Sequence, residues 1–121
     1  FQKYRGTFLD EFFYLIDAIQ SISPDVSAII SKSPYSYDNI KHNGYGNLKE
    51  IWKFQQETFE ICRKRGIKTI LNDLSKVTSP EQINGEDGIL KYYSDRLHPN
   101  DAGYLYLAKF FCEAVRRLQQ L

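Results

Sequence analysis

The chain has 121 residues, of which 42% are hydrophobic and 26% are charged, and its formal net charge is +1. This composition is that of an ordinary globular domain and excludes a disordered or collagen-like chain. Because the charges nearly balance, nothing favours nucleic acid or an anionic membrane surface as a partner. A small neutral or mildly polar substrate fits better.

Targeting signals are not evident in the sequence. No apolar run approaches the roughly 20 residues that a membrane-spanning helix needs, and the first residues do not resemble a secretory signal peptide. Since the chain begins with Phe1 rather than methionine, we expect a processed or partial chain. The compartment therefore stays open.

The cysteines and histidines give no metal-binding pattern. Cys62 and Cys112 fall within helical patterns rather than in loops, so we expect both to be buried free thiols. His42 and His98 lie far apart, and no pair of closely spaced cysteines occurs. We therefore expect no metal site and no cofactor.

The first half of the chain predicts a helix followed by a strand. Apolar residues recur every three or four positions from Leu9 to Ile22, which is the period of a helix that buries one face. The helix is expected to end at Ser23, before Pro24, because a residue that precedes proline disfavours helical geometry. The short run 26–31 is rich in β-branched residues and predicts a strand buried on both faces.

The next segment, 32–47, mixes proline, glycine, asparagine and tyrosine without a period, which predicts a loop. It follows the carboxyl end of a strand, where open parallel sheets bind their ligands. Tyr35, Tyr37 and Tyr45 are therefore candidate substrate-wall residues. The alternative is that these tyrosines simply cover the end of the sheet.

A second helix and a second strand follow. Leu48, Trp52 and Phe59 belong to an amphipathic pattern that ends in the basic residues 63–65 and Gly66, and both features are typical of a helix C-terminus. We interpret the basic residues as a helix-end feature and not as a nucleic-acid patch. The run 67–71 predicts another buried strand. Two helix-to-strand units in succession indicate an α/β fold with a parallel sheet.

The last part of the chain predicts an irregular stretch and a long helix. Residues 74–94 contain Pro80, Gly85 and Gly88 and read as turns that form no complete calcium-binding loop. Residues 99–101 are a typical helix start, and the helix is expected to run to Gln120. Its inner face is expected to consist of Tyr104, Leu107, Ala108, Phe111, Val115 and Leu118.

Asp95 and His98 stand just before this helix, three positions apart. A histidine that acts as a general base needs a partner on one ring nitrogen, so that the other nitrogen can take a proton from a nucleophile. A carboxylate within one turn of loop can be that partner. The alternative is that His98 belongs only to the start of the helix and has a capping role.

The residues 95–100, Asp-Arg-Leu-His-Pro-Asn, followed by Ala-Gly-Tyr and a helix, resemble the last sequence block of the SGNH hydrolases, also called GDSL-type esterases. The resemblance implies a flavodoxin-like, three-layer α/β/α fold with a parallel sheet, of which this chain supplies about two strands and three helices. It also implies that His98 is the general base of a serine esterase and that Asp95 orients it.

The other blocks of that family are missing. No Gly-Asp-Ser sequence occurs, and Asn72-Asp73 has Ile70 where the oxyanion block requires glycine. Ser31, Ser33, Ser36 and Ser94 lie near the expected site, but none follows the strand-to-helix elbow of a nucleophile. The resemblance therefore covers only the carboxyl-terminal half of an SGNH domain.

Residues 1–121 are accordingly expected to be part of a single domain that needs an amino-terminal half or a partner chain. Two strands alone would leave an apolar sheet edge unpaired, which agrees with this expectation. The expected activity is hydrolysis of a small-molecule or glycan ester, such as an acetylated carbohydrate. Two alternatives stay open: a non-catalytic binding module with the same fold, and an O-acyltransferase that uses the same residues.

Overall fold

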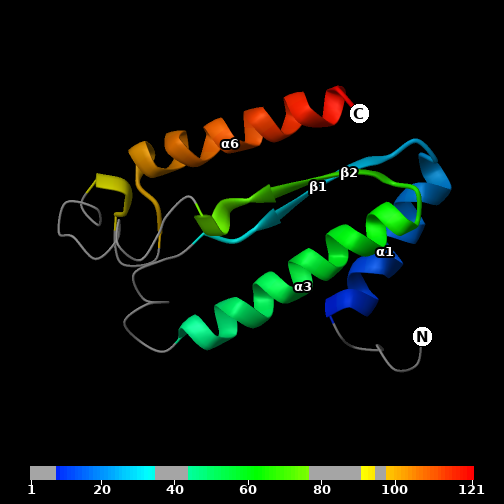
Figure 1. Ribbon diagram of the computed structural model, residues 1–121, viewed down its shortest axis with the longest axis horizontal. Helices are drawn as coiled ribbons and strands as arrows, with labels where there is room; N and C mark the ends of the chain where they lie inside the picture. Colours follow the sequence, from blue (N-terminus) through cyan, green and yellow to red (C-terminus); the bar gives the residue numbers. More distant parts are fainter. Residues whose placement is uncertain (1–7, 35–43, 77–90, 95–97) are drawn as a thin grey trace.

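The computed structural model describes residues 8–34, 44–76, 91–94 and 98–121. In these ranges the chain forms three long helices and two strands (Figure 1). The elements are α1 (Phe8–Ile22), β1 (Ser27–Lys32), α3 (Gly44–Lys64), β2 (Lys68–Asp73), a short 3-10 helix (Leu74–Lys76) and α6 (Asp101–Gln119). None of the described helices is long and apolar enough to cross a membrane.

The two strands are parallel neighbours, paired from Ser27 opposite Lys68 to Lys32 opposite Asp73. Helix α6 lies on one side of this sheet, and α1 and α3 lie on the other (Figure 1). The prediction of an α/β fold with parallel strands is therefore confirmed for the described part of the chain.

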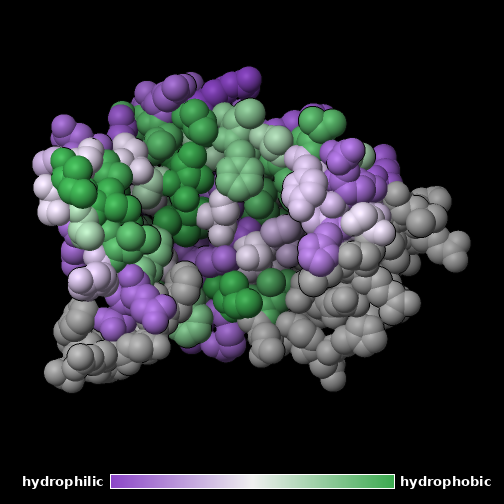
Figure 2. Space-filling view, turned by 180° about the vertical axis from the view of Figure 1, so that it is seen from behind, coloured by the Kyte–Doolittle hydropathy of each residue, from purple (hydrophilic) through white to green (hydrophobic). Residues whose placement is uncertain are grey.

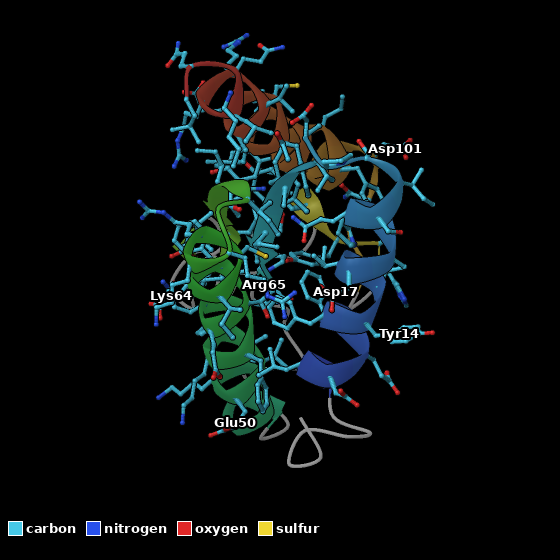
Figure 3. The ribbon with its side chains drawn as sticks, turned by 90° about the vertical axis from the view of Figure 1, so that its right-hand side faces the viewer. Tyr14, Asp17, Glu50, Lys64, Arg65 and Asp101 are labelled. Carbon is cyan, nitrogen blue, oxygen red and sulfur yellow. The ribbon has the colours of Figure 1, made fainter. Side chains whose placement is uncertain are left out.

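The core forms where α1 and α3 meet the sheet. Its buried residues come from α1, β1, the end of α3 and the residue before β2: Leu9, Phe13, Ile16, Ile30, Cys62 and Ile67. Arg65 lies between α3 and α1, while Tyr14 points away from both (Figure 3). The Arg65 guanidinium stands 4.4 Å from the centre of the Phe13 ring, and its Nη1 atom is 2.6 Å from Oδ1 of Asp17.

The end of α3 was predicted correctly and has a clear physical cause. Gly66 has a φ of +80°, a conformation that glycine adopts without steric cost. Its N–H donates to the Arg63 carbonyl, and the Ile67 N–H donates to the Cys62 carbonyl, both at 3.0 Å. This Schellman arrangement ends the helix and directs the chain into β2.

The prediction for α1 was correct, whereas those for the buried faces of α6 and β1 were wrong. Helix α1 agrees with its prediction within one residue. The predicted inner face of α6 is wrong, because Tyr104 is 58% exposed and Phe111 44% exposed, whereas Gly103 and Ala114 are buried. The buried face is thus displaced by about one residue toward the N-terminus. In β1 only Ile30 is buried, so burial on both faces is also wrong for that strand.

Two further corrections concern the expected loop and one cysteine. The loop expected over 32–47 is shorter than predicted, since β1 includes Lys32 and α3 begins at Gly44. Cys62 is a buried free thiol as expected, but Cys112 is exposed. Cys112 lies on the side of α6 that faces away from the sheet, next to exposed Phe111.

Candidate functional site

His98 lies two residues before the N-cap of α6 and pairs through its backbone with Ser94. The Ser94 N–H donates to the His98 carbonyl at 2.9 Å, and the Ser94 hydroxyl donates to the same oxygen at 3.2 Å. Tyr93 and Pro99 form an antiparallel bridge. The segment on each side of residues 95–97 is therefore held by backbone contacts.

Asn100 joins these paired residues to the helix. As the N-cap of α6, its side-chain oxygen accepts from the Gly103 N–H at 2.9 Å, which satisfies one of the free donors of the first turn. Its side-chain NH₂ donates to the Lys91 carbonyl at 3.2 Å, and its backbone N–H donates to the Tyr92 carbonyl at 2.9 Å. One asparagine thus binds both the start of α6 and the carbonyls of Lys91 and Tyr92.

Gly103 allows the first turn of α6 to lie directly against the backbone of Tyr92. A Cβ atom at position 103 would stand 2.1 Å from the Tyr92 carbonyl oxygen and 3.0 Å from the Pro99 Cβ. The Tyr92 and Tyr106 rings stack with their centres 5.0 Å apart. The remaining cavity here is only about 10 Å³, so the support of the residues around His98 is closely packed.

The residues around His98 lie toward the carboxyl ends of the two strands (Figure 1). Both strands point toward the end of the molecule at which α6 begins (Figure 1). Ligands of open parallel sheets bind outside the carboxyl ends of the strands. The His98 side chain is exposed there. Its expected partner Asp95 lies outside the described residues.

The candidate substrate-wall residues are mostly outside the described part as well. Tyr35 and Tyr37 lie in the range 35–43, of which nothing is described. The backbone of Tyr45 belongs to the first turn of α3, so its placement in a loop was wrong. Its side chain lies outside what the structure describes.

A polar network that the sequence did not predict joins the ends of the strands. Lys32 Nζ stands 3.8 Å from Oδ2 of Asp73, and the other oxygen of Asp73 accepts from the Ser75 N–H at 3.1 Å. On the opposite face of the sheet, Asn72 Nδ2 donates to Ser31 Oγ at 3.3 Å. These pairs follow from the strand register, which places residues 31 and 32 opposite 72 and 73.

Trp52 and Gln55 hold the chain directly after β1. Trp52 Nε1 donates to the Ser33 carbonyl at 2.6 Å. Gln55 accepts from the Ser33 N–H at 3.0 Å and donates to the Ser33 hydroxyl at 3.1 Å. Neither contact was predicted from the sequence. The available signal was a tryptophan and a glutamine three positions apart, and therefore on the same face of the helix.

The described serines serve structural contacts. The hydroxyls of Ser31 and Ser33 accept from side-chain amides, and that of Ser94 donates to a backbone carbonyl. Ser36 lies outside the described residues. The buried thiol of Cys62 is also unsuited to nucleophilic attack, because burial raises its pKa, although nearby Arg65 partly opposes that rise.

Comparison with known proteins adds no assignment. No family model matches the chain, and no significant match was found among curated proteins or solved structures. Only the chain's own residues therefore indicate its function.

Proposed function

We propose that this chain is the carboxyl-terminal half of an SGNH-type serine esterase, with His98 as general base and Asp95 as the residue that orients it. The observation that carries the proposal is the pairing of residues 92–94 with residues 98–100. It presents His98 at the carboxyl end of a parallel sheet, directly before a capped helix.

The support of the residues around His98 suits the proposed chemistry. A general base must stand within hydrogen-bond reach of the hydroxyl whose proton it takes. Here His98 is fixed at its carbonyl by Ser94 and at its C-terminal side by Asn100. In the proposed reaction His98 accepts the serine proton, the Asp95 carboxylate stabilises the imidazolium, and the proton then passes to the leaving alcohol.

The edge of β1 is the place where the other half of the sheet would add. Strand β1 contains Ala28, Ile29 and Ile30 yet is less buried than the more polar β2. On the face shown in Figure 2, hydrophobic side chains gather over α1 and α6 on either side of a hollow. The exposed large hydrophobic residues of these helices are Tyr14, Leu15, Ile22, Tyr104, Leu105, Phe111 and Val115.

A parallel strand beside β1 would account for both the edge of β1 and the exposed apolar residues of α1 and α6. It would pair with the free backbone groups of that edge, and helices connected to it would cover the apolar surfaces of α1 and α6. In the proposal, the serine nucleophile and the donors of the oxyanion hole belong to this added half.

The test is to express the chain joined to the polypeptide encoded before Phe1 and to measure hydrolysis of 4-nitrophenyl acetate. We expect His98→Ala to reduce kcat by about 10²- to 10⁴-fold, which is the usual contribution of a general base. The control is His42→Ala, which should keep the activity of the parent protein. Full activity of the His98→Ala variant would overturn the assignment.

Two further assays separate the alternatives. Acetylated carbohydrates compared with long-chain esters test the proposed glycan-ester substrate, and a free sugar acceptor separates hydrolysis from acyl transfer by the products formed. A folded joined protein that hydrolyses none of these esters, yet binds acetylated carbohydrate, would favour the non-catalytic binding module.

A further inference from the structure

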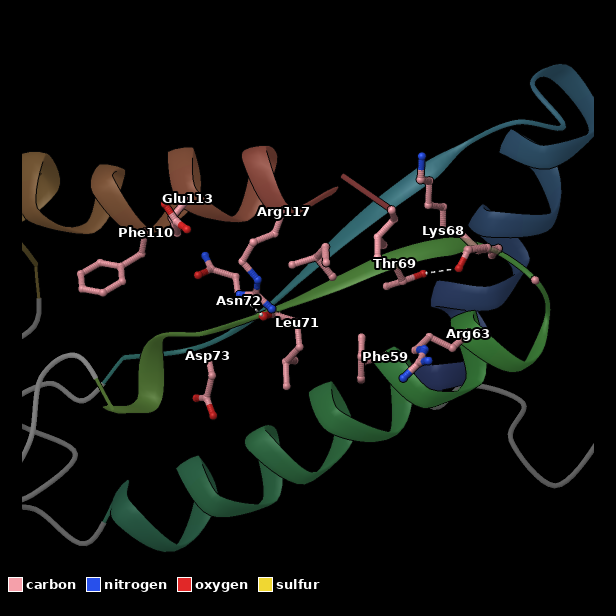
Figure 4. Close-up of a pocket in the computed structure, with 14 residues that line it drawn as sticks. Phe59, Arg63, Lys68, Thr69, Leu71, Asn72, Asp73, Phe110, Glu113 and Arg117 are labelled. Carbon is pink, nitrogen blue, oxygen red and sulfur yellow. Dashed lines mark hydrogen bonds between the residues drawn. The ribbon is translucent and has the colours of Figure 1, made fainter. Parts of the chain in front are cut away.

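A groove of about 910 Å³ runs along the edge of β2 that does not pair with β1. Its floor is the strand itself, from Lys68 to Asp73 (Figure 4). Phe59 and Arg63 of α3 form one wall, while Phe110 and Arg117 of α6 form the other. The groove lies along a different edge from the one to which the proposed second half of the enzyme would add.

The backbone of β2 offers hydrogen-bonding groups to this groove. Arg117 Nη1 donates to the Leu71 carbonyl at 3.5 Å, so the backbone groups of Leu71 face the α6 wall of the groove rather than β1. Because the direction alternates along a strand, those of Thr69 and Asp73 face the same way. The contact with Arg117 is long and exposed, so another donor can replace it.

The charges of the groove are not balanced. Its acidic residues are already paired with cations outside it: Glu113 Oε2 lies 3.6 Å from Arg116 Nη1, and Asp73 pairs with Lys32. Among the described residues, the three groove cations Arg63, Lys68 and Arg117 form no ion pair. The groove therefore presents an excess of positive charge beside an edge of β2 that pairs with no other strand in the described part of the chain.

We infer that this groove binds an extended acidic segment of a partner polypeptide, which adds to β2 as a further strand. Backbone hydrogen bonds would give affinity, and the walls would select side chains. The six residues of β2 span about 20 Å, which matches an acidic segment of six to eight residues. The aromatic rings on both walls favour β-branched residues between the acidic ones.

The same charges disfavour two other occupants. A second copy of the chain at this edge would bring its own Arg63, Lys68 and Arg117 toward the same three cations, and like charges that face each other are destabilising. Nucleic acid would use the cations but would leave the strand edge and the apolar parts of both walls without partners.

The probe is a fluorescein-labelled, eight-residue peptide of alternating valine and glutamate, and its binding to the full chain is measured by fluorescence anisotropy at low ionic strength. We expect saturable binding that weakens with added salt. Arg117→Glu should weaken it by about three-fold or more, since one favourable exposed pair becomes repulsive. Lys109→Glu is the matched control, because Lys109 is an exposed cation of α6 that does not line the groove.

Backbone pairing has its own readout. Binding should slow amide hydrogen exchange at Thr69, Leu71 and Asp73, and it should change exchange little at Ile70 and Asn72, which face β1. A peptide with prolines at alternate central positions lacks the required N–H groups and should bind more weakly. If Arg117→Glu disturbs folding, as judged by circular dichroism, Lys68→Glu replaces it.

Several results would overturn the inference. These are no binding of the glutamate peptide, equal binding of a valine-lysine peptide, equal binding of the proline peptide, or equal weakening by Lys109→Glu and Arg117→Glu. A single-stranded oligonucleotide that binds more tightly than the glutamate peptide and protects none of the three amides would also contradict it.

Discussion

Gly103→Ala tests whether the residues around His98 are supported by direct contact with α6. Two effects oppose each other. Alanine is the better helix former and would raise the free energy of unfolding by about 0.8–1 kcal/mol. Its Cβ, however, would stand 2.1 Å from the Tyr92 carbonyl oxygen, which is a backbone atom and not the end of a flexible side chain.

The steric clash should destabilise the fold by more than the gain in helix propensity stabilises it. Relief of the clash requires the segment 91–93 to move from α6, which strains the bridge between Tyr93 and Pro99 and the hydrogen bond from Asn100 to Tyr92. Overpacking costs about 1–3 kcal/mol and a lost hydrogen bond about 1 kcal/mol. After the gain in helix propensity, we expect a net loss of about 1–3 kcal/mol.

The measurement is urea and thermal unfolding followed by circular dichroism, with NMR shifts of residues 91–100 as a local probe. A loss of 1 kcal/mol should lower Tm by about 3–5 °C in a chain of this size. Gly66→Ala is the control: it strains a φ of +80° in open space and should leave residues 91–100 unchanged. A Gly103→Ala variant with a raised Tm would refute the reasoning.

Four further predictions concern the helix cap, the two cysteines and Arg65. Asn100→Ala should lower the free energy of unfolding by about 1 kcal/mol, because the α6 cap is lost. It should also disturb the His98 NMR signals. Asn100→Asp keeps the capping oxygen and should therefore retain most of the stability measured by urea unfolding. Ellman's reagent should label exposed Cys112 quickly in the folded chain and buried Cys62 only after unfolding, so Cys112→Ser should abolish the fast phase. Burial raises the pKa of the Cys62 thiol above its ordinary value, so the unfolded chain loses this proton first, and the contribution of Cys62 to stability should fall as the pH rises past the ordinary pKa of a free thiol. Cys62→Ala should remove that part of the pH dependence. Arg65→Ala should lower the free energy of unfolding by about 0.5–1 kcal/mol, because the contact with the Phe13 ring is lost. Arg63 lies farther from its ring, 5.7 Å from the centre of Phe59, so Arg63→Ala should lower the free energy of unfolding by less.

Local patterns determined the order and type of the described elements. Helix α1, the C-terminus of α3 at Gly66 and the start of α6 at Asn100 agree with the sequence because each depends on neighbouring residues: apolar periodicity, a glycine with positive φ, and a side-chain cap. The parallel arrangement was also predictable, since a strand, a helix and a second strand connect in that way. The function inferred from Asp95 and His98 stays a prediction.

Tertiary structure decided what the local patterns left open. The buried face of α6 is set by Gly103 against Tyr92 and not by the largest apolar residues, so Phe111 is exposed and Cys112 is not in the core. The pairs Lys32 with Asp73 and Ser31 with Asn72 arise from strand register, which hydrophobic periodicity does not specify for polar strand ends. The groove along β2 has the same origin, because only the packing of α3 and α6 against the sheet brings Arg63 and Arg117 to one strand edge.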